Sequence, residues 1–295
     1  ITVSVISIYF NFQVSVFFSQ LIFMKRSKSF IFCFFFVLMS LVMVMTFGSG
    51  CSSNSMEYCV ETGECELAVD VVKISSGIPM DPNDPFWADS DRFQKKTIEL
   101  GPQMMTNPKW PNPSIKSVKI SAVQNESEIA LLLEWEDTTL ENKIEVSAIH
   151  TDQAAIMFPL HPGKEVPSIT MGSENEIVNI WQWRAIWEAS LLTESRGRNR
   201  DSRILTPSNI RRSPVEDLTA AGFSTLTTQE EQDVLGHGRW QDKTWRVVFK
   251  RTLVNSDNAD IQFRYPIVMA IAVWNGGNRE RNGQKGISNW ILLRL

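Results

Sequence analysis

The chain has 295 residues, of which 43% are hydrophobic and 21% are charged. This composition excludes a disordered tail and a solenoid of polar repeats, and the length suits one large domain or two small ones. The formal net charge of −4 leaves no surplus of basic side chains that could displace counterions from phosphates. A nucleic-acid partner is therefore not expected.

The start of the chain carries the features of an export signal. The first methionine is Met24, so we expect residues 1–23 to be an over-extension of the reading frame. Basic side chains follow Met24 and precede an apolar run over 30–47, which predicts a secretory signal peptide over residues 24–50. Because the apolar run is just long enough to cross a bilayer, a retained N-terminal anchor is the alternative. Either interpretation predicts a periplasmic or otherwise exported protein.

Three of the four cysteines lie in an expected N-terminal extension over residues 51–79. Cys51 directly follows the signal segment, in the place where a lipoprotein carries its lipidated cysteine. Cys59 and Cys65 are close enough in sequence to form a small disulfide loop in an oxidising compartment. The sequence has no Cys-x-x-Cys-His motif, so covalent haem attachment is excluded.

Short strands between turn signals dominate the rest of the chain. They alternate polar and apolar residues or are wholly apolar, and the polar sequences between them are typical of turns. We therefore expect a mainly β protein, a β-sandwich over residues 80–295 with a few short helices in its loops. The strands expected with most support span 117–123, 128–135, 245–253, 267–274 and 289–295.

Two further segments leave alternatives open. Apolar residues recur at helical spacing over 178–192, although the tryptophan-rich sequence fits a strand as well. The stretch from 194 to 214 is polar and rich in arginine, which favours a solvated surface loop. The alternative is a docking patch for an acidic partner.

The usual catalytic motifs are missing from the sequence. It has no phosphate-binding Gly-x-x-x-x-Gly-Lys-Ser/Thr loop, no Gly-x-Gly-x-x-Gly, no Gly-x-Ser-x-Gly elbow and no His-Glu-x-x-His. Nothing selects a catalytic triad around any of the three histidines. A self-sufficient enzyme is therefore not expected.

An ordered set of segments resembles a known family. In order and character the set resembles the haem b-binding γ subunits of DMSO-reductase-type molybdoenzymes, such as ethylbenzene dehydrogenase, dimethylsulfide dehydrogenase, chlorate and selenate reductases, and nitrite oxidoreductase. The resemblance extends over roughly residues 80 to 295, and no single segment is specific. The matching segments are 134–137, 154–159, 171–172, 178–185, 221–227, 238–249, 272–276 and 280–290.

The resemblance implies one non-covalent haem b held by an axial Met and Lys pair. Met171 and Lys285 match the two ligand positions best, with Met157 and Lys250 as the second choices. The tryptophans expected to flank the porphyrin are Trp181, Trp183, Trp274 and Trp290. The arginines expected near its propionates are Arg184, Arg239, Arg246 and Arg281.

The function implied is electron transfer within a molybdenum oxidoreductase complex. The partners would be an Fe–S β subunit and a molybdopterin α subunit, with a c-type cytochrome or a membrane carrier as the external partner. The alternative is a β-sandwich without haem that binds carbohydrate or acts as a protein scaffold. The two differ in one respect, because only a haem site requires Met171 and Lys285 to meet at one cavity.

Overall fold

The computed structural model describes residues 67–144, 150–161, 166–195 and 212–295. The apolar run over 30–47, the three cysteines discussed above and most of the arginine-rich stretch lie outside these residues. Within them, no helix is long and apolar enough to cross a membrane. The elements in chain order are β1 (Ala68–Lys73), α4 (Pro85–Ala88), β2 (Lys96–Glu99), β3 (Ser117–Gln124), β4 (Glu128–Glu136), β5 (Gln153–Pro159), β6 (Val178–Arg184), α5 (Ala185–Ser195), β7 (Val215–Ala220), β8 (Thr227–Thr228), β9 (Leu235–Gln241), β10 (Thr244–Thr252), β11 (Ile267–Trp274), β12 (Gly286–Ile287) and β13 (Ile291–Arg294).

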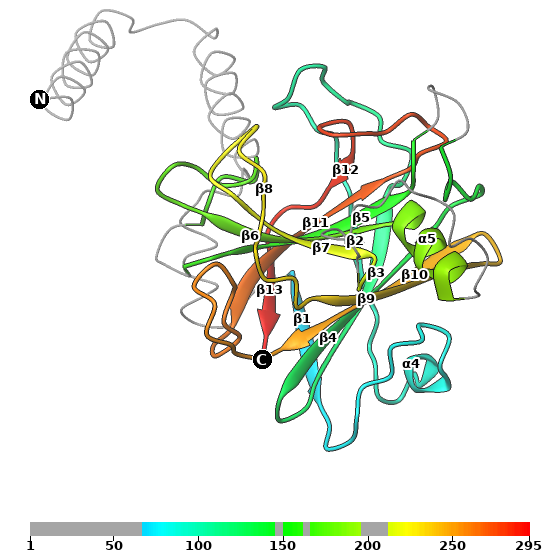
Figure 1. The fold of residues 1–295 in the computed structure, drawn as a ribbon, viewed down its shortest axis with the longest axis vertical. Helices are drawn as coiled ribbons and strands as arrows, with labels where there is room; N and C mark the ends of the chain where they lie inside the picture. Colours follow the sequence, from blue (N-terminus) through cyan, green and yellow to red (C-terminus); the bar gives the residue numbers. More distant parts are fainter. Residues whose placement is uncertain (1–66, 145–149, 162–165, 196–211) are drawn as a thin grey trace, which may run out of the picture. The chain divides into compact units, whose positions relative to one another are not determined.

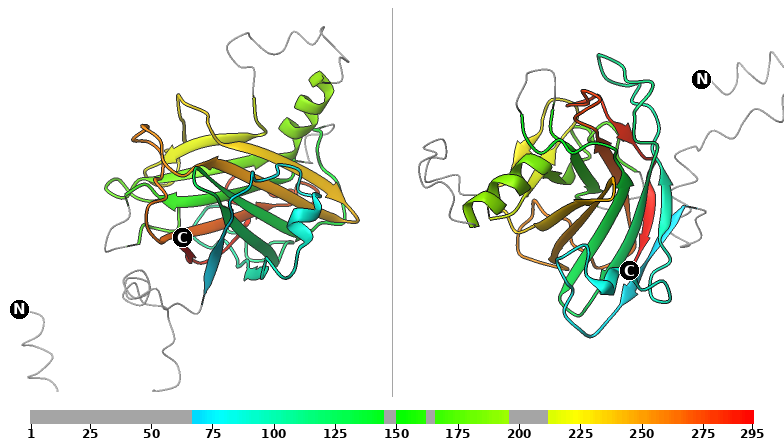
Figure 2. Two further views of the ribbon diagram at one scale, coloured as in Figure 1. Left: turned by 90° about the horizontal axis from the view of Figure 1, so that it is seen from below. Right: turned by 90° about the vertical axis from the view of Figure 1, so that its right-hand side faces the viewer.

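The strands form one continuous path of hydrogen-bonded neighbours, in the order β8-β7-β6-β5-β11-β13-β1-β3-β4-β10-β9. We call β5 to β8, β11 and β12 the first half of the sheet, and β1 to β4, β9 and β10 the second half (Figure 1). Strand β13 joins them, antiparallel to β11 and parallel to β1. The sheet curls so that the two halves face each other (Figure 2). The protein is thus mainly β, as the sequence predicts, and its sandwich is a single curled sheet.

The main core lies between the two halves. Alternation along β11 turns Ile267, Met269, Ile271 and Val273 into this core. From the other half, the paired strands β4 and β10 turn Leu131, Leu133, Val247 and Phe249 into the same core. Three tryptophans meet at one end of the core, where the ring centroids of Trp183 and Trp245 lie 4.8 Å apart.

The structure decides between the two alternatives for 178–192, and each holds for part of the segment. Residues 178–184 form strand β6, and the helix α5 begins at Ala185. The strand part has partners on both sides, since all of β6 pairs with β5 and residues 178–183 pair with β7. Its side chains also alternate between the two faces, which a helix would not allow.

The sheet also begins earlier than the boundary at residue 80 that the sequence suggests. Strand β1 pairs with β13 on one side and with β3 on the other, so it belongs to the same domain. The strands expected over 117–123, 128–135, 245–253 and 267–274 correspond closely to β3, β4, β10 and β11.

The outer face of the first half is also apolar, which is unusual for an antiparallel sheet. Every residue of β5 and of β11 is buried, on both faces. A second apolar cluster covers this outer face, and partly buried side chains of the loop that leads to β6 pack against it. Loops rather than a further sheet therefore cover this side of the protein.

The core between the halves should set the stability of the domain. Leu133 of β4 is fully buried there, so Leu133→Ala should lower the free energy of unfolding by about 2–5 kcal/mol in urea denaturation. The matched control is Leu140→Ala, because that side chain is 42% exposed, and it should change the value by about 0.5 kcal/mol or less. An equal loss in both variants would contradict the assignment of this core.

Candidate functional site

A cavity of about 380 Å³ lies on the outer face of the first half. Its volume falls in the range of about 300–1,000 Å³ that is usual for cofactor and small-molecule sites. The floor is formed by β5, β6 and β11. Ala155, Ala270 and Ala272 point outward there, and their short side chains leave space above the sheet. The walls come from four loop segments, which are 103–106, 169–171, 223–226 and 282–285.

Met171 enters the cavity from the loop before β6. Its backbone has φ 74°, in the left-handed region that costs a non-glycine residue on the order of 1–3 kcal/mol. The loop holds this conformation with two hydrogen bonds, from the Gly172 N–H to the Ser168 carbonyl and from the Gly222 N–H to the Met171 carbonyl, both 2.8 Å. Gly172 also has positive φ, and a Cβ atom there would lie 2.2 Å from the Glu176 carbonyl oxygen. Only glycine fits that place, and it fixes the side of the cavity from which Met171 enters.

Lys285 enters from the opposite side of the floor. It directly precedes β12, which pairs with β11, whereas the Met171 loop lies beside the start of β6 and the end of β7. The Lys285 Nζ atom lies 4.7 Å from the centroid of the Trp274 ring, and the Trp274 indole N–H donates to the Asn282 carbonyl at 3.0 Å. Among the residues described, no carboxylate forms an ion pair with Lys285.

Burial lowers the pKa of Lys285 to about 8. The ammonium form loses hydration in the cavity and gains only the face of Trp274 in return. A proton is therefore removed from this amine more easily than from an exposed lysine. The neutral amine is the form that can bind a metal ion.

Buried acids hold the base of the loop that carries Lys285. Glu280 is fully buried and accepts from the Trp110 indole at 3.0 Å, from the Ser114 N–H at 2.8 Å and from the Asn275 N–H at 2.9 Å. Asp152 accepts from the Gly276 N–H at 2.9 Å, and desolvation raises its pKa to about 8. These bonds fix where the loop leaves β11.

One end of the cavity is polar. The Gln182 side-chain amide donates from Nε2 to Gln153 Oε1 at 2.8 Å, and Arg184 Nη2 donates to Gln182 Oε1 at 3.2 Å. The guanidinium of Arg184 lies over the Trp187 ring, 4.3 Å from its centroid. A planar cation at this end provides a place for an anionic group of a ligand.

The structure brings together five of the side chains that the sequence selected. Met171, Lys285, Arg184 and Trp274 all line this cavity, and so does Met157, the second choice for the sulfur ligand. Two cavity residues that sequence reasoning missed are Gln153 and Gln182. The sequence signal for each is a glutamine within a mostly apolar strand, but only the structure shows that both face the cavity.

Other selected side chains lie elsewhere. Trp183 was expected beside the porphyrin, but alternation along β6 turns it to the inner core, where its indole donates to Glu188 at 3.1 Å. Trp181 faces the same core. Lys250, the second choice for the amine ligand, lies on β10 in the other half and pairs with Glu128 at 3.1 Å. These three assignments to the cavity are therefore corrected.

The remaining arginines and tryptophans are also separated from the cavity. Arg246 forms an ion pair with Glu134 at 3.1 Å in the second half. Arg239 lies 3.8 Å from Asp81. Arg281 and Trp290 do not line the cavity. Of the arginines and tryptophans selected from the sequence, Arg184 and Trp274 are the ones that do.

The fold and the cavity together define a class of protein, a β-sandwich domain with a cofactor-sized pocket on the outer face of one half. The family model described as ethylbenzene dehydrogenase matches residues 84–286, which include β2 to β11 and most of the cavity residues. The chain belongs to this family.

Three curated relatives support the assignment. A putative respiratory nitrate reductase heme subunit of Haloferax mediterranei is 28% identical over 62% of this chain and 57% of its own length. The chlorate reductase subunit gamma of Ideonella dechloratans is 24% identical over 79% of this chain and 86% of its own. The dimethylsulfide dehydrogenase subunit gamma of Rhodovulum sulfidophilum is 27% identical over 78% of this chain and 82% of its own. The chain thus matches just over half the length of the first relative and more than four-fifths of the other two.

Among solved structures, a family 9 carbohydrate-binding module from Caldicellulosiruptor kristjanssonii aligns with 77% of this chain and 93% of its own. The TM-score is 0.39 and the identity is 10%.

The buried amine predicts a specific pH dependence of stability. The pKa of Lys285 is about 8 in the folded chain and 10.5 in the unfolded chain, so the unfolded chain binds more protons between these values. The effect of Lys285 is therefore to raise the free energy of unfolding as the pH increases from about 8 to about 10.5. In protein purified without a bound ligand, Lys285→Met should raise Tm by a few degrees at pH 7, and this gain should vanish near pH 10.5.

Thermal denaturation at several pH values measures this effect, and Lys250→Met is the matched control. The control should lower Tm slightly or leave it unchanged, because Lys250 has a carboxylate partner. A gain in Lys285→Met that stays constant from pH 7 to pH 10.5 would show that the amine is not desolvated.

Proposed function

We propose that this protein is an exported electron-transfer subunit that binds one haem b in the cavity of the first half. The observation that carries the proposal is the convergence of Met171 and Lys285 on one cavity, from separate loops on opposite sides of its floor. A carbohydrate-binding module gives no reason for a thioether and an amine to meet in this way.

The residues present fit the haem group. Alanines keep the floor apolar and leave space above it, which suits an apolar macrocycle, and the polar end with Arg184 suits its carboxylates. Met171 would supply a soft sulfur ligand, which favours the reduced iron and raises the potential. Lys285 would supply a neutral amine, and its desolvated position makes the loss of its proton easier.

Bound there, the haem would exchange single electrons. If Met171 and Lys285 both held the iron, a substrate would find no free position on it, and the group would supply electron transfer rather than catalysis. Trp274 would keep Lys285 at the edge of the cavity, and the buried acids below would keep the loop in place.

The setting of this subunit is part of the same proposal. Two of the curated relatives are named as gamma subunits of chlorate reductase and of dimethylsulfide dehydrogenase. By analogy, this chain would assemble with an Fe–S β subunit and a molybdopterin α subunit, and exchange electrons with a c-type cytochrome or a membrane carrier. Export through residues 24–50, with cleavage, a retained anchor or a lipidated Cys51, would place it in the periplasm.

The first test is the absorption spectrum of the purified protein, oxidised and reduced, with a pyridine haemochrome assay. We expect a low-spin spectrum and about one extractable haem b per chain, because two strong axial ligands favour the low-spin state. If no haem is bound after expression with ample haem and with the partner subunits, the electron-transfer proposal fails. A binding module or a scaffold would then be the better explanation.

The second test identifies the ligands with paired variants. Met171→Ala should lower the reduction potential or release the haem, and Met157→Ala is its control because both side chains line the same cavity. Lys285→Ala should alter the low-spin spectrum, whereas Lys250→Ala should leave it unchanged because Lys250 lies in the other half of the sheet. If the control variants change the spectrum and the two proposed variants do not, the ligand assignment is wrong.

A further inference from the structure

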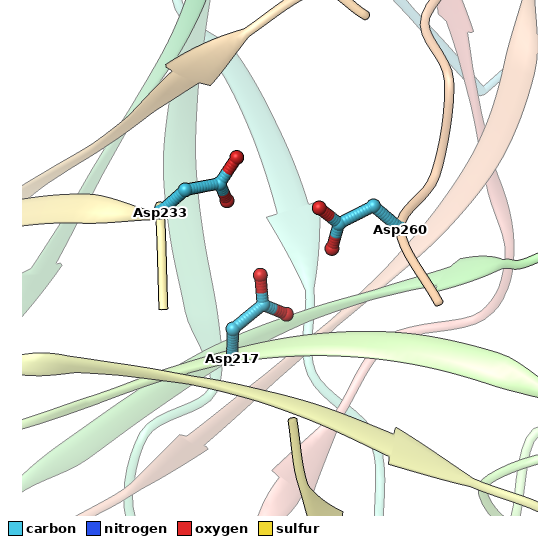
Figure 3. Close-up of side chains that lie close together, drawn as sticks. All are labelled: Asp217, Asp233 and Asp260. Carbon is cyan, nitrogen blue, oxygen red and sulfur yellow. The ribbon is translucent and has the colours of Figure 1, made fainter. Parts of the chain in front are cut away.

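Three aspartates meet on the inner side of the sheet, away from the haem cavity. Asp217 belongs to β7, Asp233 to the segment between β8 and β9, and Asp260 to the connection from β10 to β11. One carboxylate oxygen from each lies within 4.8 Å of the other two, and the three side chains point toward one another (Figure 3). The neighbour Leu218 packs on the outer face, so alternation turns Asp217 to the opposite, inner face.

This cluster, which we call the Asp cluster, joins parts of the fold that share no strand pairing. The strand path ends with β8 and β7 on one side and with β10 and β9 on the other. Asp217 lies at the first end, Asp233 lies just before β9 at the second, and Asp260 follows β10. Whatever holds the three carboxylates together therefore holds the two ends of the curled sheet together.

The charges of the Asp cluster are only partly compensated. Asp217 and Asp260 are 1% and 3% exposed, and Asp233 is half-buried. In the part of the chain that the structure describes, one basic side chain pairs with the cluster, Arg251, whose Nη1 lies 3.2 Å from Asp260 Oδ1. If all three carboxylates are ionised, one guanidinium leaves two negative charges, and burying uncompensated charge is costly.

Some of the carboxylate oxygens accept hydrogen bonds, and others accept none from the described residues. The amides of Asn179 and Gln229 donate to Asp217 Oδ1 at 2.6 and 3.0 Å. The Asn255 amide donates to Asp233 Oδ2 at 2.9 Å and to Asp260 Oδ2. Among the described residues, Asp217 Oδ2 and Asp233 Oδ1 are buried and accept no hydrogen bond.

Gln229, which is not acidic, gives a separate indication of a ligand. The side chain is 8% exposed, and its amide nitrogen donates both to Asp217 Oδ1 at 3.0 Å and to the Ala259 carbonyl at 3.1 Å. The amide is thus placed between Asp217 and the residue before Asp260. Its Oε1 atom is buried and, within the described residues, also lacks a donor. Buried acceptors in native proteins are nearly always satisfied, so a missing partner is indicated.

We propose that the Asp cluster, with Gln229, binds one Ca²⁺ ion that ties the two ends of the sheet together. The ligand set is all oxygen, which calcium prefers and zinc does not. Calcium–oxygen distances of about 2.3–2.6 Å put ligands on opposite sides of the ion about 5 Å apart, in line with the 4.8 Å within which the cluster atoms lie. The ion would supply the missing positive charge. It would also coordinate the buried oxygens that accept no hydrogen bond.

A shared proton is the competing explanation. Burial and the neighbouring Asp260 raise the pKa of Asp217 to about 9, so without an ion Asp217 would be protonated and could donate to Asp260. The shared proton would neutralise one charge and give one carboxylate oxygen a hydrogen-bond partner. Asp233 Oδ1 and Gln229 Oε1 would still accept no hydrogen bond from the described residues. The two explanations differ in metal content and in the response to calcium.

The experiment uses the full chain and two readouts. Trp181 donates to Asn179 at 3.2 Å, and Asn179 donates to Asp217, so tryptophan-sensitised Tb³⁺ luminescence should report an ion in the Asp cluster. We expect luminescence that Ca²⁺ suppresses by competition, about one Ca²⁺ per chain by elemental analysis, and a Tm about 5 °C higher at about 1 mM Ca²⁺ than with a chelator.

Matched variants assign the response. Asp233→Asn removes a half-buried carboxylate at the edge of the Asp cluster and should abolish the luminescence and the Tm shift. Glu231→Gln removes an exposed carboxylate from the same segment and should keep both. The haem spectrum should stay unchanged in either variant, because the cavity lies on the other face.

Two results would overturn the proposal. The first is wild-type protein that carries no calcium after dialysis against about 1 mM Ca²⁺ and shows the same Tm with calcium and with chelator. The shared proton would then explain the Asp cluster. The second is an equal loss of signal in Asp233→Asn and Glu231→Gln, which would indicate ions bound at the surface.

Discussion

Burial of both faces of β5 and β11 is the constraint on which the rest of this structure depends. An antiparallel sheet normally leaves one face to water, whereas here the inner face packs against the second half and the outer face is apolar as well. The loops that cover the outer face do not fill the space above it, and the small alanine side chains beneath them leave a cavity of about 380 Å³. The same arrangement that shields the sheet therefore creates the site.

The site is built from loops that are held more firmly than loops usually are. Met171 keeps a left-handed conformation because Gly172 makes a turn that no other residue fits. The loop of Lys285 is fixed by Glu280, which is fully buried and accepts several hydrogen bonds. Strain and buried charge of this kind lower stability, and proteins tend to retain them at functional sites. In this domain the large core between the halves offsets them.

Buried charges also occur on the inner side, where they meet a different need. The curled sheet has two ends that do not pair with each other, and the Asp cluster lies where those ends approach. Closing a sheet by side chains rather than by a strand ladder requires groups that attract each other strongly. Carboxylates do so only through a shared proton, a basic side chain or a cation, and Arg251 provides one such partner.

The sequence by itself determined the class of fold, most of the central strands and the family, because alternation and apolar runs are local properties that survive without a partner. It also selected Met171, Lys285 and Arg184, through an ordered set of motifs. It could not determine which face of β6 carries Trp183, or that Lys250 lies in the other half of the sheet, because a shift by one residue reverses every side chain and only pairing sets the register. The tertiary structure alone decided which loops cover the outer face and that Asp217, Asp233 and Asp260 meet, since these contacts join segments that are distant along the chain.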